Sequence, residues 1–374
     1  MSKFLFSLSL LCILCQAGHA QDKVITARVA SIPAASCASV DDLAAYIKQN
    51  FSTDEEKLNA IFLWVANNIN YDVPRMRNAE NNPGGPPQPV ADVLFTRNAV
   101  CEGYSELFVA LCKGVGINAI VVPGYTKKQG KIGDLPHAWV AAPLGAEWYL
   151  FDPTWGAGFV RDDQFTRRLN NSFYKVRPEN FIADHMPFDP MYQFLSQPLT
   201  NKEFTDGTHG GNKNLFNYAD TLKQNGQLST VQQAAAELRR LEAGGVQNDL
   251  LRKRELYLKN VLQSFASKES FTEGNKIFMS AQLSFKEYIG HKNKHFTTIA
   301  DNDLRQLVDS IEQKTRLSRS LFSAAVSKTD AQSQAKANSL DNVDKFWARL
   351  LTEKEFTAHY LAADKDKRIQ MFRK

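Results

Sequence analysis

A thiol stands at the start of an otherwise apolar stretch in residues 97–117, RNAVCEGYSELFVALCKGVGI. The spacing of apolar residues predicts a helix that begins at Cys101 and ends near Gly114 and Gly116. A helix N-terminus stabilises a thiolate, and its free backbone N–H groups can also hold an oxyanion. Cys101 is therefore a candidate nucleophile. Cys112 lies in the apolar middle of the same helix and is predicted to be inert core.

A nucleophilic thiol needs a base, and the base needs a carboxylate that orients it. His137 opens the segment HAWV, and Asp152 follows EWYLF directly before Pro153. A hairpin turn near Gly145 would set this histidine beside this carboxylate on adjacent strands. Taken singly, each residue also fits a structural role, with His137 bonding a backbone carbonyl and Asp152 forming a turn before proline.

The surrounding segments predict an α+β domain. Residues 41–69 have helical periodicity, with Ser52 and Glu55 as a capping box, and the Pro- and Gly-rich residues 80–89 predict a loop. After the Cys101 helix come a β-branched strand, a polar turn and two further strands. These segments read, in order, INAIVVPGY, KKQGKIGD, HAWVAAPL and EWYLFDPTW. Helices followed by an antiparallel sheet are typical of the α+β class.

The composition changes near residue 207, where THGGNKN predicts a linker. Beyond it the segments are helical, each with an apolar stripe that is most simply bundle core. The predicted helices are STVQQAAAELRRLEA, NDLLRKRELYLKNVLQSFASK, NKIFMSAQLSFKEYI, DNDLRQLVDSIEQKTRLSRSLFSAAVSK and NVDKFWARLLTEKEFTAHYLAAD. We therefore expect a catalytic domain at 21–206 and a helical C-terminal domain at 207–374.

The first twenty residues, MSKFLFSLSLLCILCQAGHA, have the pattern of a secretory signal peptide. Lys3 precedes a short apolar run, and Gly18 and Ala20 suit the −3 and −1 positions of a cleavage site. Leu14 before Cys15 does not fit a lipoprotein signal. We expect cleavage near Ala20 and export to the periplasm or the extracellular space, with no integral membrane segment in the rest of the chain.

Cleavage would leave three cysteines, Cys37, Cys101 and Cys112, so at least one thiol stays free or pairs between chains. Cys101 and Cys112 would lie roughly 16 Å apart on one helix, beyond disulfide reach, whereas a bond between Cys37 and Cys112 stays open. The formal net charge of +5 comes without a dense basic stripe of interleaved aromatic residues. This pattern does not favour nucleic-acid binding.

The motifs occur in a specific order, C-E-G-Y-x-x-L-F, G-I-x-A-x-x-V-x-G-Y, L-P-H-A-W-V and W-Y-x-F-D-P-T-W. Together they resemble the transglutaminase-like superfamily of papain-like Cys–His–Asp enzymes. The upstream segment WVANNINYD resembles the kyphoscoliosis-peptidase branch in particular. The resemblance covers roughly residues 50–190 and implies a helix-plus-antiparallel-sheet catalytic core.

Carried over by position, the resemblance implies that Cys101 is the nucleophile, His137 the base and Asp152 the orienting residue. Further matching positions are expected to belong to the framework, and these are Gly103, Trp139 and Trp155. Tyr71 could lie near the cleft, although core packing is its simpler role. The calcium loops of animal crosslinking enzymes are not apparent, so the resemblance implies neither a metal nor a cofactor.

The sequence thus predicts a secreted cysteine enzyme that acts on amide bonds through a Cys101 thioester, most simply a peptidase. A protein-crosslinking acyltransferase is one alternative, and a non-catalytic envelope binding or scaffold protein with a vestigial triad is another. The expected partner is a protein or peptide substrate, with cell-wall peptide as one candidate. The sequence determines neither the oligomeric state nor the role of the helical C-terminal half.

Overall fold

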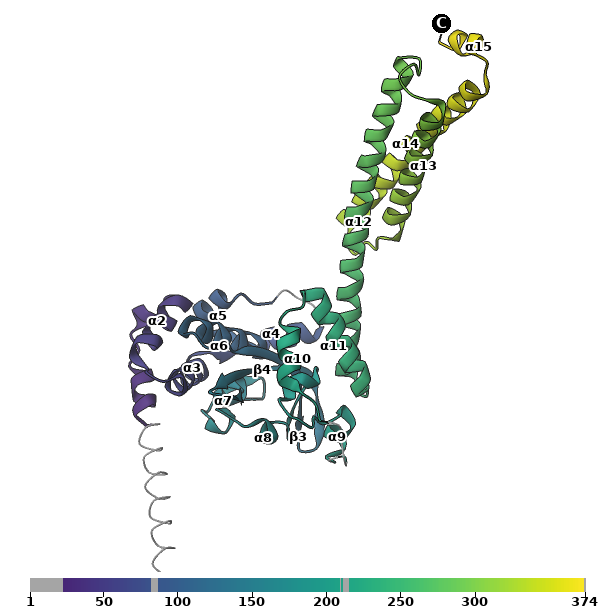
Figure 1. Cartoon of the computed structure of the whole chain (residues 1–374). Helices are drawn as coiled ribbons and strands as arrows, with labels where there is room; N and C mark the ends of the chain where they lie inside the picture. The colour runs from purple at the N-terminus through teal and green to yellow at the C-terminus, as the bar shows by residue number, and fades with distance from the viewer. Residues whose placement is uncertain (1–22, 82–86, 209, 211–214, 373–374) are drawn as a thin grey trace, which may run out of the picture. The chain divides into compact units, whose positions relative to one another are not determined.

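The computed structural model describes residues 23–81, 87–208, 210 and 215–372. The expected signal peptide at residues 1–20 lies outside these ranges. Contacts between residues divide the chain into two compact units (Figure 1). The first comprises Met1–Ser229 with Ala236–Leu256, and the second comprises Thr230–Ala235 with Tyr257–Lys374. The first unit has the predicted α+β fold, and the described part of the C-terminal region is helical, as expected.

The first unit combines short helices with a four-stranded sheet. Its helices are α2 (Val40–Asn50), α3 (Asp54–Asn68), α4 (Val73–Asn81), α5 (Val90–Thr96), α6 (Cys101–Val115), α7 (Pro153–Ala157), α8 (Pro178–Phe181), α9 (Asn201–Asp206) and α10 (Tyr218–Asn225), with 3-10 turns η1 (Ala34–Cys37), η2 (Asn171–Phe173) and η3 (Pro190–Gln193). Its strands are β1 (Asn70–Tyr71), β2 (Asn98–Ala99), β3 (Ile120–Lys128), β4 (Lys131–Leu144), β5 (Glu147–Phe151), β6 (Gly158–Arg161), β7 (Gln164–Arg167) and β8 (His185–Pro187).

The central sheet is antiparallel and has the strand order β5-β4-β3-β8. The predicted hairpin at Gly145 joins β4 to β5, and Gly145 has a φ of 65° that suits glycine. The turn between β3 and β4 is shorter than the predicted KKQGKIGD. It consists of Gln129 and Gly130 alone, both with positive φ, and the residues on either side pair in the two strands. Two-residue turns with positive φ match the twist of antiparallel strands.

Alternate residues of β4 serve two separate cores, as the period of two in a strand requires. Val140 and Ala142 join the large core that contains the apolar faces of α2, α3 and α6. Trp139 and Ala141 join a second core on the opposite face of the sheet, together with Phe181 and other aromatic residues. Helix α6 packs against β4, and α2 and α3 pack on α6. The sheet is therefore covered on both faces.

The helix α3 begins one residue later than the predicted capping box implies. Thr53, not Ser52, is the N-cap, and its partner is Glu56 rather than Glu55. The sequence STDEE allows both frames. The observed frame lets the Glu56 carboxylate accept from the backbone N–H groups of Ser52 and Thr53, at 2.8 Å and 3.4 Å.

The second unit contains the long helices α12 (Asp249–Asn293), α13 (Asp301–Ala324) and α14 (Asp330–Ala362), and the short α15 (Lys365–Gln370). Helix α12 begins in the first unit, and α11 (Thr230–Gly244) contributes to both. The sequence predicted two helices where α12 is continuous. Gly274 does not interrupt it, because the absence of a side chain there lets Phe322 of α13 approach within 2.9 Å of the position of a Cβ. This packing offsets the cost of about 1 kcal/mol for glycine inside a helix.

The contact units do not follow the expected division at residue 206, because α11 and the start of α12 bind elements of the first unit. Arg240 forms two hydrogen bonds with the buried Asp189, at 2.8 Å and 2.7 Å. Asn201 donates to the backbone carbonyl of Gly245 at 2.9 Å. Whether the chain also folds as 21–206 and 207–374 stays a prediction, which limited proteolysis near residues 206–213 would test.

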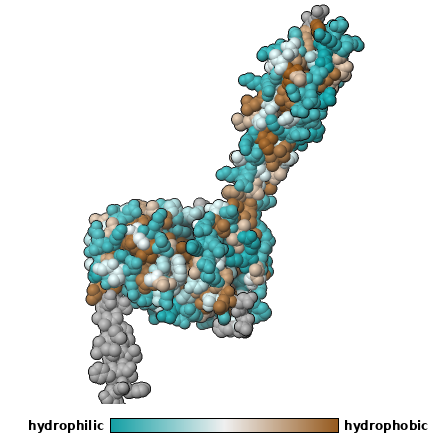
Figure 2. All heavy atoms as spheres, in the orientation of Figure 1, coloured by the Kyte–Doolittle hydropathy of each residue, from teal (hydrophilic) through white to brown (hydrophobic). Residues whose placement is uncertain are grey.

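The surface of both units is mostly polar on the face shown in Figure 2, with apolar residues interspersed. In the second unit, several large apolar side chains are exposed, among them Met279, Leu283, Leu317 and Leu351. Among the residues that the structure describes, no helix has both the length and the apolar character needed to cross a membrane.

Candidate active site

Cys101 is the first residue of α6, as predicted, and it is half-buried. The preceding Val100 has an extended backbone, and its side chain has no acceptor with which to cap the helix. The chain reaches this point through Arg97, in the left-handed region with φ 56°, and β2. The first-turn N–H groups beside the thiol are therefore not used by a side-chain cap, so they are available to a bound ligand.

The motif residues around Cys101 hold the start of α6 in place. At Gly103, a Cβ would lie 2.8 Å from the Cβ of Ala99, so a larger residue would push α6 away from β2. The Tyr104 hydroxyl donates to the carbonyl of Ile69 at 2.6 Å. Strand β2 pairs in parallel with β1, which belongs to the segment WVANNINYD. This pairing explains why that upstream segment accompanies the cysteine motif.

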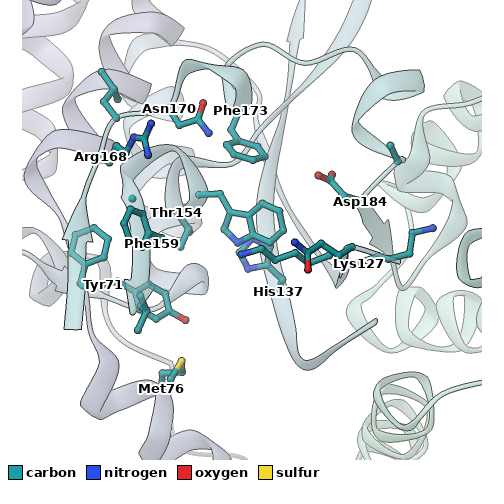
Figure 3. Close-up of a pocket in the computed structure, with 18 of the residues that line it drawn as sticks. Tyr71, Met76, Lys127, His137, Thr154, Phe159, Arg168, Asn170, Phe173 and Asp184 are labelled. Carbon is teal, nitrogen blue, oxygen red and sulfur yellow. The ribbon is translucent and has the colours of Figure 1, made fainter. Parts of the chain in front are cut away.

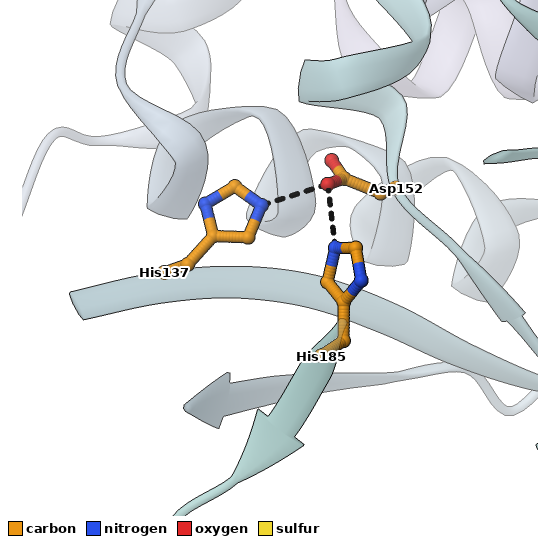
Figure 4. A group of neighbouring side chains, drawn as sticks. All are labelled: His137, Asp152 and His185. Atoms are coloured by element: carbon orange, nitrogen blue, oxygen red, sulfur yellow. Dashed lines mark hydrogen bonds and ion pairs between the residues drawn. The ribbon is translucent and has the colours of Figure 1, made fainter. Parts of the chain in front are cut away.

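His137 and Asp152 meet as the hairpin prediction requires. His137 lies on β4 and pairs in register with Gly124 of β3. Asp152 follows β5 and is the N-cap of α7, where its Oδ1 accepts from the backbone N–H groups of Thr154 at 2.9 Å and Trp155 at 3.0 Å. Its Oδ2 lies 2.7 Å from Nε2 of His137 (Figure 4). The N-cap bonds fix the carboxylate so that its other oxygen faces the histidine.

The electrostatics of the pair favour an imidazolium and a carboxylate. Burial alone would lower the pKa of His137, but the Asp152 charge and hydrogen bond outweigh burial and raise this pKa to about 10. The Cys101 side chain raises this pKa further, so the thiol lies near the imidazole. Burial opposes ionisation of Asp152, yet His137 holds the pKa of that carboxyl well below its usual range. The structure thus brings Cys101, His137 and Asp152 together.

A second histidine, which the sequence did not single out, completes this cluster. His185 opens β8, and its Nε2 lies 3.1 Å from Oδ2 of Asp152 (Figure 4). The ring is fully buried. Its segment, IADHMPFDP, has no spacing that points to chemistry, and only the pairing of β8 with β3 brings it to the site.

Asp152, His137 and His185 each offer a metal-ligand atom, and these atoms lie within 4.8 Å of one another. The contacts fit hydrogen bonding better than coordination. Both Nε2 atoms lie at hydrogen-bond distance from the same Oδ2, at 2.7 Å and 3.1 Å, so each uses its N–H toward the carboxylate rather than a lone pair toward an ion. The arrangement is that of a hydrogen-bonded His–Asp–His cluster.

A cleft of about 900 Å³ opens at His137 (Figure 3). One group of lining residues is apolar or aromatic, and a second group carries positive charge. The apolar group contains Tyr71, Met76, Trp155, Phe159, Val160, Phe165, Leu169 and Phe173, and the cationic group contains Lys127, Lys128 and Arg168. Tyr71 also packs against the large core, so it combines both roles considered for it. A volume of about 900 Å³ lies within the range that is typical of ligand pockets.

Trp139 and Trp155 were both expected to be framework residues, and the structure places them differently. Trp139 is fully buried in the sheet, as expected for a framework residue. Trp155 is half-buried and lines the cleft, with its ring 5.5 Å from that of His137. It therefore belongs to the wall of the site as well as to the framework.

The other two cysteines are free and have different surroundings. Cys112 is completely buried in the large core, and burial raises the pKa of its thiol far above the usual value. It is therefore inert core, as predicted. Cys37 is half-buried and free, so a disulfide with Cys112 is not formed.

Comparison with known proteins agrees with the motifs. Residues 41–153 match the model of the transglutaminase-like superfamily. The chain is 32% identical over 178 residues to human kyphoscoliosis peptidase, covering 46% of this chain and 26% of that protein. It is 26% identical over 183 residues to hillarin of Drosophila melanogaster, covering 44% and 22%. A solved TGase structure covers 37% of this chain and 36% of its own, with 22% identity and a TM-score of 0.26.

Within the first unit, residues 41–153 are thus similar to the transglutaminase-like superfamily. Within that superfamily, the relatives confirm the resemblance to the kyphoscoliosis-peptidase branch. The chain spans about a quarter of the length of the curated relatives that it matches. The activity and substrates of the whole protein are therefore matters for proposal.

Proposed function

We propose that this protein is a cysteine enzyme that cleaves amide bonds of protein or peptide substrates through a Cys101 thioester. The observation that carries the proposal is the 2.7 Å contact between His137 and Asp152 beside a thiol at a helix N-terminus. Burial, hydrogen bonding and the pKa of about 10 at His137 suit a histidine that enters the reaction as imidazolium.

In the proposed reaction, the Cys101 thiolate attacks the amide carbonyl, and the N–H groups at the start of α6 stabilise the oxyanion. The tetrahedral intermediate collapses as the C–N bond breaks, and His137 gives its proton to the leaving amine. Water, deprotonated by His137, then attacks the thioester. Collapse releases the acid and restores the thiolate–imidazolium pair, while Asp152 orients the imidazole throughout.

Hydrolysis is proposed over transfer to a second amine. Two of the curated relatives carry the name peptidase, and water needs no dedicated binding site for an acceptor amine. The cleft has an apolar wall with Lys127, Lys128, Arg168 and Asp184 beside it, which suits a peptide segment with apolar side chains. Cell-wall peptide remains one substrate of this chemistry, and crosslinking remains the alternative if an added amine captures the thioester.

The test is turnover of a casein-type substrate or a peptide library by the wild type, by Cys101→Ala and by Cys37→Ala. Cys37→Ala is the matched control, because Cys37 is also free and half-buried. We expect loss of cleavage in Cys101→Ala alone. Cleavage by Cys101→Ala at the wild-type rate would refute the mechanism. A folded wild type that turns over no amide substrate would favour the scaffold function with a vestigial triad.

The proposal includes export, on the basis of the charged, apolar and small-residue pattern of residues 1–20. The mature chain is expected to begin at Gln21. N-terminal sequencing of the protein from its native host tests this point, and a cytosolic protein that retains Met1 would refute it.

A further inference from the structure

His185 is held on three sides by contacts that define its orientation. Its Nε2 faces Oδ2 of Asp152 at 3.1 Å, and its Nδ1 is hydrogen-bonded to the carboxylate of Asp184. The ring stacks on Phe181 with centroids 4.0 Å apart and meets the edge of Trp155 at 4.7 Å. Hydrogen bonds at both ring nitrogens and stacking on Phe181 together fix the orientation of the His185 ring.

The hydrogen bonds of His185 have a chemical consequence. An ionised carboxylate only accepts hydrogen bonds, so Nε2 of His185 donates to the carboxylate of Asp152. Asp152 then receives four donors, namely two backbone N–H groups on Oδ1 and one histidine on each side of Oδ2. His185 is one of the groups that lower the pKa of Asp152. It thereby helps to keep this carboxylate charged opposite His137.

We propose that His185 is a positioning residue that holds Asp152, and through it His137, in the geometry that the Cys101 reaction requires. The inference rests on the proposed function, because it assigns His185 a part in that reaction. His185 is fully buried and does not contact substrate. Its effect is therefore expected on the chemical step and not on substrate binding.

Strand β8 approaches β3 closely, and this approach places His185 beside Asp152. Strand β8 lies beside β3, with His185 opposite Thr126 and Pro187 opposite Gly124. A Cβ on Gly124 would come within 2.2 Å of the carbonyl oxygen of Met186 and 2.4 Å of the Trp139 ring. The glycine of the segment VVPGY thus allows β8 to approach, and the same glycine lies opposite His137 on β4.

A purely packing role makes a different prediction. If His185 only fills space between aromatic rings, then phenylalanine, which keeps the volume and the stacking on Phe181, should preserve the reaction. If His185 positions Asp152, phenylalanine should impair it. Glutamine can place an amide N–H near the position of Nε2, and it should restore function without restoring the aromatic stacking.

The experiment compares the full-length wild type with His185→Phe and His185→Gln, and with His359→Gln as an exposed histidine control in α14. Near-ultraviolet circular dichroism and thermal melting verify folding. The readouts are kcat and KM on a cleaved peptide, and the rate of Cys101 alkylation by iodoacetamide across pH, mapped by mass spectrometry. The alkylation readout does not require turnover.

We expect His185→Phe to lower kcat by about 10-fold or more, with KM within about 3-fold of the wild type. It should also slow Cys101 alkylation below neutral pH, because the imidazolium partner is less well held. His185→Gln should recover most of both losses, and His359→Gln should match the wild type.

Equal kcat and equal alkylation in folded His185→Phe and wild type would overturn the positioning role while leaving the proposed function intact. Failure of His185→Gln to recover either readout would also overturn it. A wild-type Cys101 that reacts no faster than Cys37 would overturn the proposed function, and the positioning role with it. If His185→Phe does not fold, the decision rests on His185→Gln: its recovery supports the role and its inactivity in a folded state refutes it.

Discussion

The two units bury polar groups in different ways. In the first unit, the buried polar residues include ionisable ones, Asp152, His185 and Asp189, and each is held by partners from other elements. The buried polar residues described in the second unit are Thr315, Ser318 and Thr357. Each of these hydroxyls is uncharged and donates to a backbone carbonyl within its own helix, at 2.7 to 2.9 Å, and that of Thr357 also shares a hydrogen bond with the Tyr288 hydroxyl of α12 at 2.8 Å.

The difference separates a core that holds a cluster of ionisable groups from one whose buried polar residues carry hydroxyls. A hydroxyl that donates within its own helix needs little from neighbouring elements. A buried carboxylate or imidazole needs partners from other elements, because an unpaired buried charge costs several kcal/mol. In the first unit, the partners of Asp152 come from several elements, because β4, β5, α7 and β8 converge there. That concentration of ionisable groups favours a reaction there and not in the second unit.

The largest expected effect is on turnover in the first unit. Cys101→Ala and His137→Ala should each lower kcat/KM by at least about 10³-fold, and the double variant should lose little more, because the two residues act in one step. Single-turnover and steady-state assays on the three variants measure this. Additive losses would mean that the residues act separately, and a large fall in melting temperature would favour structural roles.

A smaller effect is expected for Asp152→Asn, about 10²-fold in kcat, because Asp152 orients the imidazole without exchanging the proton. Since the carboxylate raises the pKa of His137 to about 10, the alkaline limb of the pH–rate profile should lie near pH 10 in the wild type and move to lower pH in the variant. An unchanged limb would contradict the assigned cause of that pKa.

The same pair predicts how stability depends on pH. The raised pKa of His137 contributes stability that is fully present below its ordinary value of 6.5 and is lost as pH rises through about 10. The lowered pKa of Asp152 contributes stability that is present above its ordinary value of 3.8 and is lost as pH falls below it. Chemical denaturation should therefore give the largest stability difference between wild type and Asp152→Asn at about pH 4 to 6.5, shrinking on either side.

In the second unit we expect loss of stability without loss of chemistry. Leu350 is buried among aromatic residues, so Leu350→Ala should lower the free energy of unfolding by about 2–5 kcal/mol. The neighbouring Leu351 is 47% exposed and provides the matched control, for which Leu351→Ala should cost much less. Denaturation curves and kcat/KM are measured together. A fall in kcat/KM at temperatures where both variants are folded would contradict the expectation that changes in the second unit affect stability alone.

The smallest effect contrasts two cysteines outside the candidate site, Cys112 of α6 and Cys37 of η1. Cys112→Ser puts a hydroxyl into a completely buried apolar position and should cost about 1–3 kcal/mol with unchanged kcat. Cys37→Ser, at a half-buried position, should cost less. Melting temperature and activity decide the matter, and a loss of kcat in folded Cys112→Ser would give that residue a role beyond packing.

Much of the site follows from local sequence. The spacing of apolar residues predicts the helix that starts at Cys101. The hairpin that joins β4 to β5 needs only Gly145 between two strands of alternating polarity. Because the pairing in a tight hairpin is local, the approach of His137 to Asp152 could be predicted. The roles of the three residues in catalysis stay predictions until they are measured.

Other features depend on contacts that local patterns do not specify. The capping frame of α3 was decided by the reach of Glu56, and the continuity of α12 by the packing of Phe322 on Gly274. In the first case two frames were equally allowed by sequence. In the second, the glycine that lies between the two predicted helices is accommodated by a neighbouring helix.

The sequence by itself determined the thiol at a helix start, the hairpin that carries the histidine and aspartate, and the apolar stripes of the C-terminal helices, because these depend on residues close along the chain. Only the tertiary structure decided that His185 shares the Asp152 carboxylate and that Arg240 of α11 binds the buried Asp189. These contacts join residues 33 and 51 positions apart. They form only when whole elements pack together, since a hydrogen bond between distant residues depends on the path of the chain and not on local spacing.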